Sequence, residues 1–234
     1  MEDKSTKILS YTFIISLILL FVLNSQDTTQ QWAVIVKNAS LIVALITGFI
    51  YLLILLYCLF DNKKIDSLLN VDDYEGLIKY CDKKSKKKLL FIPNRVNYYK
   101  YLILLSHLGL DNKEKIDEYF ELLKGQEFSF PMIAYWRSCY NFSNGNYETI
   151  KEDIVLFTNS SDVRKKTRKY KDLISVLSVL NLYVDGKVKE SQDTLATIDT
   201  STIVMPATKR CIEIINNTPV NTIGIEEASD LDNE

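Results

Sequence analysis

The sequence predicts an all-α protein in which two N-terminal membrane helices precede a larger domain of short helices. Almost every long apolar stretch lies before residue 61, and the chain beyond it is charged, with apolar residues at helical spacing. Hydrophobic residues make up 47% of the chain, near the average for globular proteins, so this average conceals two different parts. With only 7 glycines and 4 prolines among 234 residues, helices meet few interruptions.

The first apolar run covers residues 8–23 and would be about 24 Å long as a helix, slightly shorter than a hydrocarbon core of about 30 Å. Polar residues at both ends can lie in the interfaces, so we expect a cytoplasmic N-terminus over 1–7 and a membrane helix over 8–24. Lys4 and Lys7 also fit the start of a secretory signal peptide. The segment after the run offers no small-x-small cleavage site, which favours a retained anchor.

The second apolar run, residues 39–60, would be about 33 Å long and predicts a second membrane helix after a short external connector over 25–38. Basic residues cluster directly behind this run, at Lys63 and Lys64 and again in CDKKSKKK, whereas the connector holds a single lysine. Because basic residues concentrate on the cytoplasmic side of membrane helices, both termini are predicted to be cytoplasmic. A composition rich in Lys, Asn and Ile is typical of AT-rich bacterial genomes and favours a bacterial cell membrane.

Small residues recur every four positions in the second run, at Ser40, Ala44 and Gly48. On a helix this spacing places them on one face, where a neighbouring helix can approach closely. We expect this helix-packing face to receive the first membrane helix. A partner membrane protein or a second copy of the chain is the alternative.

Residues 61–218 are predicted to form a cytoplasmic helical domain. In YKDLISVLSVLNLY, the residues Tyr170, Leu173, Ile174 and Leu177 follow the spacing of a buried helix face. Clusters rich in Gly, Asn and Asp, namely LGLDNKE, SNGNYE and VDGKVK, predict turns between helices. The segments NKEKI and NYETI follow two of these turns and begin at residues 112 and 146, which indicates a repeat of helix pairs.

The best-defined unit, Phe130–Asn159, resembles a tetratricopeptide repeat (TPR). Tyr135 or Trp136 occupies the aromatic position of the first helix, and Gly145 and Tyr147 lie in the turn. The second helices depart from the family, because they carry Ile and Val where TPR helices have small alanines, and the spacing of the turn glycines is not constant. The resemblance implies a TPR-like α-solenoid, with an irregular helical bundle as the alternative.

This resemblance covers residues 72–198 and implies a concave surface that binds a segment of a partner protein. Exposed aromatic, amide and charged side chains of the first helices are the candidates for its lining: Asn97, Tyr98, Tyr101, Tyr135, Arg137 and Asn141. Aromatic residues at helical spacing are also what a buried core requires, and this is the alternative for each.

We expect no catalytic, cofactor-binding or metal-binding residues, and therefore no enzyme. The usual phosphate-binding, dinucleotide-binding, metalloprotease and serine-hydrolase motifs are absent, and the only histidine, His107, lies among leucines. Four widely spaced cysteines fit free thiols in a reducing compartment better than a disulfide framework or a zinc site. A net charge of −2 gives no indication of nucleic-acid binding.

Three charged segments remain. The basic run 164–171 is predicted to be a solvated helix face, with an acidic partner as the alternative. Residues 219–234, with five acids in the last nine positions, predict a flexible tail. Lysines beyond the second apolar run are candidates for contact with anionic membrane lipid: Lys63, Lys64, Lys83, Lys84, Lys86, Lys87 and Lys88.

Two functions fit these features. In the first, a membrane-anchored scaffold or accessory subunit binds a protein partner at the membrane through its cytoplasmic TPR-like domain. In the alternative, a small immunity or regulatory membrane protein binds a transporter, receptor or toxin through its transmembrane hairpin. The identity of the partner and the oligomeric state stay open.

Overall fold

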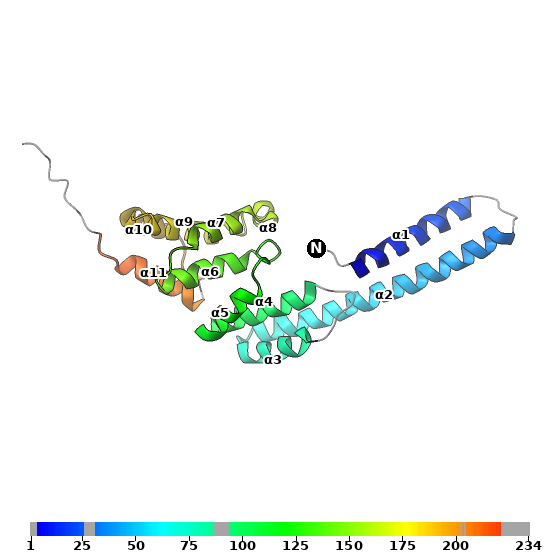
Figure 1. Ribbon diagram of the computed structural model, residues 1–234, viewed down its shortest axis with the longest axis horizontal. Coiled ribbons are helices and arrows are strands. Elements are labelled where there is room, and N and C mark those ends of the chain that lie inside the picture. The colour runs from blue at the N-terminus through cyan, green and yellow to red at the C-terminus, as the bar shows by residue number, and fades with distance from the viewer. Residues whose placement is uncertain (1–3, 26–30, 87–93, 202, 204, 221–234) are drawn as a thin grey trace, which may run out of the picture. The chain divides into compact units, whose positions relative to one another are not determined.

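Every regular element of the described chain is an α-helix, which confirms the predicted all-α class for that part (Figure 1). The computed structural model describes residues 4–25, 31–86, 94–201, 203 and 205–220. The chain divides into two compact units, 1–123 and 124–234.

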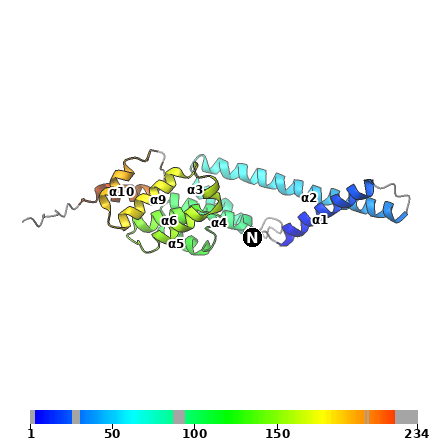
Figure 2. The same ribbon diagram turned by 90° about the horizontal axis from the view of Figure 1, so that it is seen from above.

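The first unit begins with two helices that pack along each other, α1 (Lys4–Ser25) and α2 (Gln31–Leu69) (Figure 2). Within the described residues, one helix is long and apolar enough to cross a membrane, over Ala33–Leu69, near the N-terminus. The apolar part of α1, Tyr11–Val22, is shorter.

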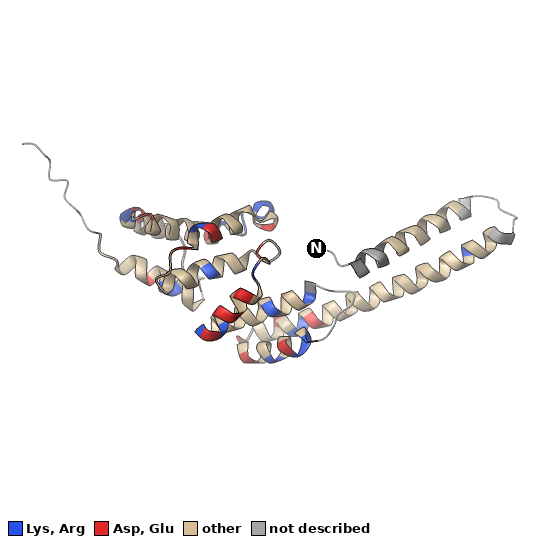
Figure 3. Cartoon of the chain, viewed as in Figure 1, with Lys and Arg blue, Asp and Glu red and all other residues tan. Residues whose placement is uncertain are grey.

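α2 continues through both boundaries that the sequence suggested for its apolar run. Most of the predicted connector over 25–38 and the first residues of the predicted domain belong to the same helix as 39–60. The segment DNKKIDSLL contains neither Gly nor Pro, so nothing in the local sequence ends the helix before Leu69. α2 therefore leads from the apolar run directly into charged sequence, and Figure 3 shows its acidic and basic residues mainly at the end near α3.

The predicted helix-packing face lies against α1. Ser40 and Ala44 are buried, and a Cβ added at Gly48 would lie 3.8 Å from Cε2 of Phe13. The Phe13 ring also meets Tyr51 edge-on, with 5.8 Å between the centroids. The absence of larger side chains on this face of α2 leaves room for the Phe13 ring.

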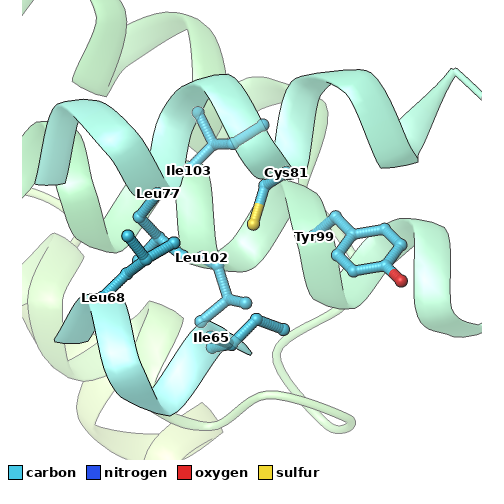
Figure 4. Close-up of a cluster of buried hydrophobic side chains, with 7 residues drawn as sticks. All are labelled: Ile65, Leu68, Leu77, Cys81, Tyr99, Leu102 and Ile103. Carbon is cyan, nitrogen blue, oxygen red and sulfur yellow. The ribbon is translucent and has the colours of Figure 1, made fainter. Parts of the chain in front are cut away.

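Three helices complete the first unit: α3 (Tyr74–Ser85), α4 (Asn94–Gly109) and α5 (Lys113–Leu122). The end of α2 is part of their core, because Ile65 and Leu68 are buried against α3 and α4 (Figure 4). The full cluster comprises Ile65, Leu68, Leu77, Cys81, Tyr99, Leu102 and Ile103. Burying a Leu or Ile contributes about 1.5–3 kcal/mol, so the last turns of α2 are held by packing and do not act as a linker.

The second unit is built around its most buried helix, α6 (Met132–Ser143), which packs on α7, α9 and α11. In the predicted buried face of residues 170–177, Tyr170 and Leu177 are buried while Leu173 and Ile174 are half-buried. The other helices of this unit are α7 (Ile150–Asn159), α8 (Ser161–Lys165), α9 (Lys171–Val184), α10 (Val188–Leu195) and α11 (Pro206–Asn217).

The same type of turn joins the two helices in each of four pairs, and three of these turns were predicted from their Gly, Asn and Asp residues. One residue in the left-handed conformation follows the first helix of each pair: Asp72, Asp111, Gly145 or Gly186. The next residue then donates its N–H to a carbonyl five residues back, at 2.9–3.0 Å: Asp73 to Leu68, Asn112 to His107, Asn146 to Asn141, and Lys187 to Leu182. This is the bond that ends a helix in the Schellman motif. The pairs α2–α3, α4–α5, α6–α7 and α9–α10 thus share one local design.

Candidate functional site

The carboxylate of Asp61 lies where the apolar run of α2 ends, and only 1% of its side chain is exposed. It accepts hydrogen bonds from the Oη of Tyr80 on α3 at 2.6 Å and from the Oη of Tyr99 on α4 at 2.8 Å. Arg95 of α4 donates from Nε at 3.0 Å and pairs through Nη2 with the same carboxylate. A single side chain of α2 is thereby bonded to two other helices.

Tyr57 and Lys84 extend this group toward the apolar run. The Oη of Tyr57 lies 3.0 Å from the Oη of Tyr99 and accepts a hydrogen bond from Nζ of Lys84 at 3.3 Å. The same Nζ lies 3.5 Å from Oδ1 of Asp61 and faces the rings of Tyr57 and Tyr80, 4.7 and 5.3 Å from their centroids. Six residues form what we call the Asp61 cluster: Tyr57, Asp61, Tyr80, Lys84, Arg95 and Tyr99.

Each of the three helices contributes two residues spaced four apart, so that both lie on one helix face. The pairs are Tyr57 and Asp61 on α2, Tyr80 and Lys84 on α3, and Arg95 and Tyr99 on α4. The start of α3 is set by Asp73, whose Oδ1 accepts the N–H of Gly76 at 2.9 Å. Sequence analysis missed this cluster, although an acid directly after an apolar run and an Arg-x-x-x-Tyr spacing were its visible signals.

Electrostatics keeps the hydroxyl groups of Tyr80 and Tyr99 protonated, and Lys84 and Arg95 charged, at neutral pH. Burial and the hydrogen bond to Asp61 raise the pKa of Tyr80 to about 12. Burial alone would lower the pKa of Arg95, but its hydrogen bonds to Asp61 outweigh this and raise it. Burial also works against the charge on Lys84, yet Tyr57 and the neighbouring groups raise its pKa. One negative and two positive charges leave a surplus of one positive charge.

This arrangement suits the fixing of helices better than catalysis. The oxygens of Asp61 are already occupied by donors from Tyr80, Arg95 and Tyr99. A buried carboxylate with satisfied hydrogen bonds is costly to separate from its partners and is not available as a base. Nor do the described residues contain a group of three His, Cys, Asp or Glu side chains that could hold a metal ion.

The second unit contains its own buried ion-pair cluster, centred on Arg137 of α6. Nε of Arg137 donates to Oδ1 of Asp153 on α7 at 2.9 Å, and Nη1 donates to Oε1 of Glu127 at 2.8 Å. The side chains of Asp153 and Glu127 are 1% and 5% exposed. Burial alone would lower the pKa of Arg137, but the hydrogen bonds to both carboxylates raise it, so the guanidinium stays charged.

Of the predicted groove residues, those in the second unit contribute to its internal packing. Tyr135 is 3% exposed, Arg137 lies in the ion-pair cluster, and Nδ2 of Asn141 donates to Oγ1 of Thr149 at 2.9 Å. Tyr135 is therefore a core residue, which was the alternative to a groove role, and its ring packs on Phe157. The signal for a core role was that α6 contains a single charged residue, Arg137.

The other three groove candidates, Asn97, Tyr98 and Tyr101, belong to α4 of the first unit and are half-buried. The rings of Tyr98 and Tyr101 stack with 6.2 Å between centroids, and Arg95 lies over the Tyr98 ring at 4.7 Å. Tyr98 thus contacts the Asp61 cluster through Arg95.

The predicted lipid-contact lysines have different environments. Lys63, Lys64, Lys83 and Lys86 are exposed, and Lys84 is half-buried in the Asp61 cluster. Lys87 and Lys88 lie outside the described residues, as does most of the predicted tail, from residue 221. The basic run 164–171 has mostly exposed side chains; it begins in the last turn of α8 and ends at the first residue of α9, and so does not lie along one helix.

The only histidine of the sequence and three of the four cysteines are buried, whereas Cys58 is half-buried. His107 is 8% exposed, its Nδ1 has no hydrogen-bond partner among the described residues, and its ring packs on Tyr119 with 5.6 Å between centroids. The thiols of Cys81, Cys139 and Cys211 are free and buried, and burial raises the pKa of Cys81 to about 12.

Comparison with known proteins adds no further assignment. A scan against protein-family models and searches of curated proteins and of solved structures found no match to this chain.

Proposed function

We propose that the protein is a membrane-anchored scaffold or accessory subunit of a bacterial cell membrane, and that its TPR-like helical domain binds a protein partner in the cytoplasm. In this proposal α1 and α2 are a two-span anchor with both termini in the cytoplasm. The observation that supports the proposal best is the turn shared by four helix pairs. Repeated helix pairs commonly form extended surfaces that bind protein segments, and this step is an analogy at the level of the fold.

The junction between α2 and the domain suits a scaffold. Because Ile65 and Leu68 of α2 lie in the domain core and Asp61 bonds to α3 and α4, the first helix pairs have little freedom to move relative to the apolar run. A partner bound by these helices would be held at a fixed distance from the bilayer. A flexible tether would only raise its local concentration.

The alternative places recognition in the transmembrane hairpin of an immunity or regulatory protein. The sequence feature that suggests this alternative is the helix-packing face. However, Ser40 and Ala44 of this face are buried where α1 packs on α2. Between residues 41 and 60, the exposed side chains of α2 are large and apolar, such as Leu45, Phe49 and Leu53, which suit contact with lipid. These two observations favour recognition by the helical domain.

Co-purification from gently solubilised native membranes tests the proposal. The baits are the full chain and a fragment that begins at Asp61, whose helical folding is first checked by circular dichroism. Capture of the same partner by both baits supports recognition by the domain. Capture by the full chain alone, with a folded fragment, assigns recognition to the hairpin and refutes the scaffold.

A further inference from the structure

Lys84 has the most exposed and least tightly bonded charged group of the Asp61 cluster. Its side chain is 21% exposed, against 12% for Arg95 and 1% for Asp61. The two polar contacts of its Nζ measure 3.3 and 3.5 Å. Charge-assisted hydrogen bonds are usually 2.7–2.9 Å long, and an ammonium group has three protons to donate. The ammonium therefore keeps the capacity to donate a shorter hydrogen bond to an anionic acceptor.

The ammonium also lies at the level where the apolar surface of α2 ends. Its partner Tyr57 is in the last turn of the apolar run, and Leu59 and Phe60 beside it are 56% and 72% exposed. Exposed apolar side chains of this kind are expected to face lipid, and Tyr rings are typical of the boundary with the headgroups. If α2 crosses a bilayer, Nζ of Lys84 reaches the headgroup layer.

The local charge favours an anion at this place. Within the cluster, Lys84 and Arg95 share the single carboxylate of Asp61. Of the acids close by, Asp82 is paired with Lys86 at 2.6 Å, and Asp66 is exposed on α2. The exposed lysines Lys63, Lys64 and Lys83 add to the positive potential. An anionic headgroup would meet a net positive surface here.

We propose that Lys84 binds the phosphate of an anionic phospholipid, while Tyr57 and Asp61 hold its ammonium at the headgroup level. In this site the phosphate oxygen accepts a hydrogen bond from Nζ of Lys84, whose two contacts within the cluster are long. This site rests on the proposal that α2 crosses the membrane, and it does not depend on the protein partner. Because Lys84 belongs to α3 and Tyr57 to α2, a bound lipid stabilises the junction between these helices.

Native mass spectrometry of the full chain in mild detergent tests the site. Phosphatidylglycerol is the anionic probe, and phosphatidylcholine, which carries a phosphate without net negative charge, is the reference. We expect Lys84→Gln to weaken phosphatidylglycerol binding about fivefold, as the loss of one interfacial lysine predicts. Lys79→Gln, which removes an exposed lysine from the same helix, is the matched control and should change it less than twofold. Lys84→Arg should retain binding.

Each contrary result overturns the assignment. Equal losses for Lys84→Gln and Lys79→Gln would show diffuse attraction to a basic surface, and unchanged binding in Lys84→Gln would exclude Lys84. Displacement of the lipid by millimolar inorganic phosphate would indicate a free-anion site. If Lys84→Gln misfolds, the unsubstituted chain provides the test. Phosphatidylglycerol should raise its unfolding temperature more than phosphatidylcholine does, and equal shifts would refute the site. Recovery of the chain in the membrane fraction is scored separately, so a failed anchor is not mistaken for a failed lipid site.

Discussion

Asp61 is the residue on which the packing of three helices depends. Its replacement by Asn leaves Arg95 largely buried without a counter-ion, because the guanidinium has Asp61 as its ion-pair partner. We expect the free energy of unfolding to fall by about 3 kcal/mol in Asp61→Asn. Asp66→Asn removes an exposed carboxylate from the same helix and should cost less than about 1 kcal/mol.

Thermal unfolding of both variants in one detergent, followed by circular dichroism, gives the comparison. Equal midpoints for Asp61→Asn and Asp66→Asn would show that the Asp61 cluster contributes nothing to stability.

Tyr80 should make the fold sensitive to alkaline pH. Its pKa is about 12 in the folded protein and near the ordinary 10 once unfolded, so the folded state binds more protons between these values. Stability linked to Tyr80 is therefore complete below pH 10 and is lost as the pH rises toward 12. Denaturant midpoints measured from pH 8 to 12 should fall less steeply in Tyr80→Phe. Parallel curves would contradict the linkage.

Arg137 has the corresponding role in the second unit. Arg137→Met leaves Asp153 and Glu127 buried without their cation, and we expect a loss of about 3–5 kcal/mol. Lys151→Met breaks the more exposed ion pair with Asp185 and should cost less than about 1 kcal/mol. Urea unfolding of the two variants measures both losses of unfolding free energy. Similar losses would show that the ion-pair cluster contributes no more to stability than an exposed ion pair.

At the scale of the element, the shared turn makes opposite predictions for its two kinds of left-handed residue. Gly145 and Gly186 have φ of 76° and 78°, where an added Cβ costs about 1–2 kcal/mol. Neither Cβ would meet another atom within 4 Å, so backbone strain is the only cost of Gly145→Ala. Asp111, with φ of 54°, already bears that strain, and Asp111→Gly should be neutral or stabilising.

Chemical unfolding of Gly145→Ala and Asp111→Gly measures both effects. A destabilised Asp111→Gly would mean that the Asp side chain contributes more at this turn than the relief of strain returns.

The helices and turns could be predicted because their signals are local. Spacing in 170–177 and the Gly, Asn and Asp clusters depend on neighbours within a few residues. The Asp61 cluster could not, because it needs three helices to meet at residues 61, 80 and 95. Arg137 was predicted to be an exposed groove residue for the same reason: its ion-pair partner Asp153 lies on another helix.

At the scale of the whole molecule, the continuity of α2 is the feature with most consequence. A helix that carries apolar side chains to Phe60 and core side chains from Ile65 has no hinge between these parts. In the first unit the apolar run and the following helix pairs should thus behave as one body. Such coupling is needed by a scaffold that positions its partner at the membrane.

Proteolysis of membrane vesicles tests this coupling together with the proposed orientation. Trypsin cleaves segments that can open locally, and the exposed side chains of Lys63 and Lys64 lie on helical backbone between the buried residues Asp61 and Ile65. The basic run 164–171, by contrast, lies largely in the turn between α8 and α9. In inverted vesicles we expect cleavage within 164–171 well before cleavage at Lys63 or Lys64, with fragments assigned by mass spectrometry. Early cleavage at Lys63 or Lys64 would show that α2 breaks at the end of its apolar run. Cleavage of either segment in sealed right-side-out vesicles would place the domain outside the cell.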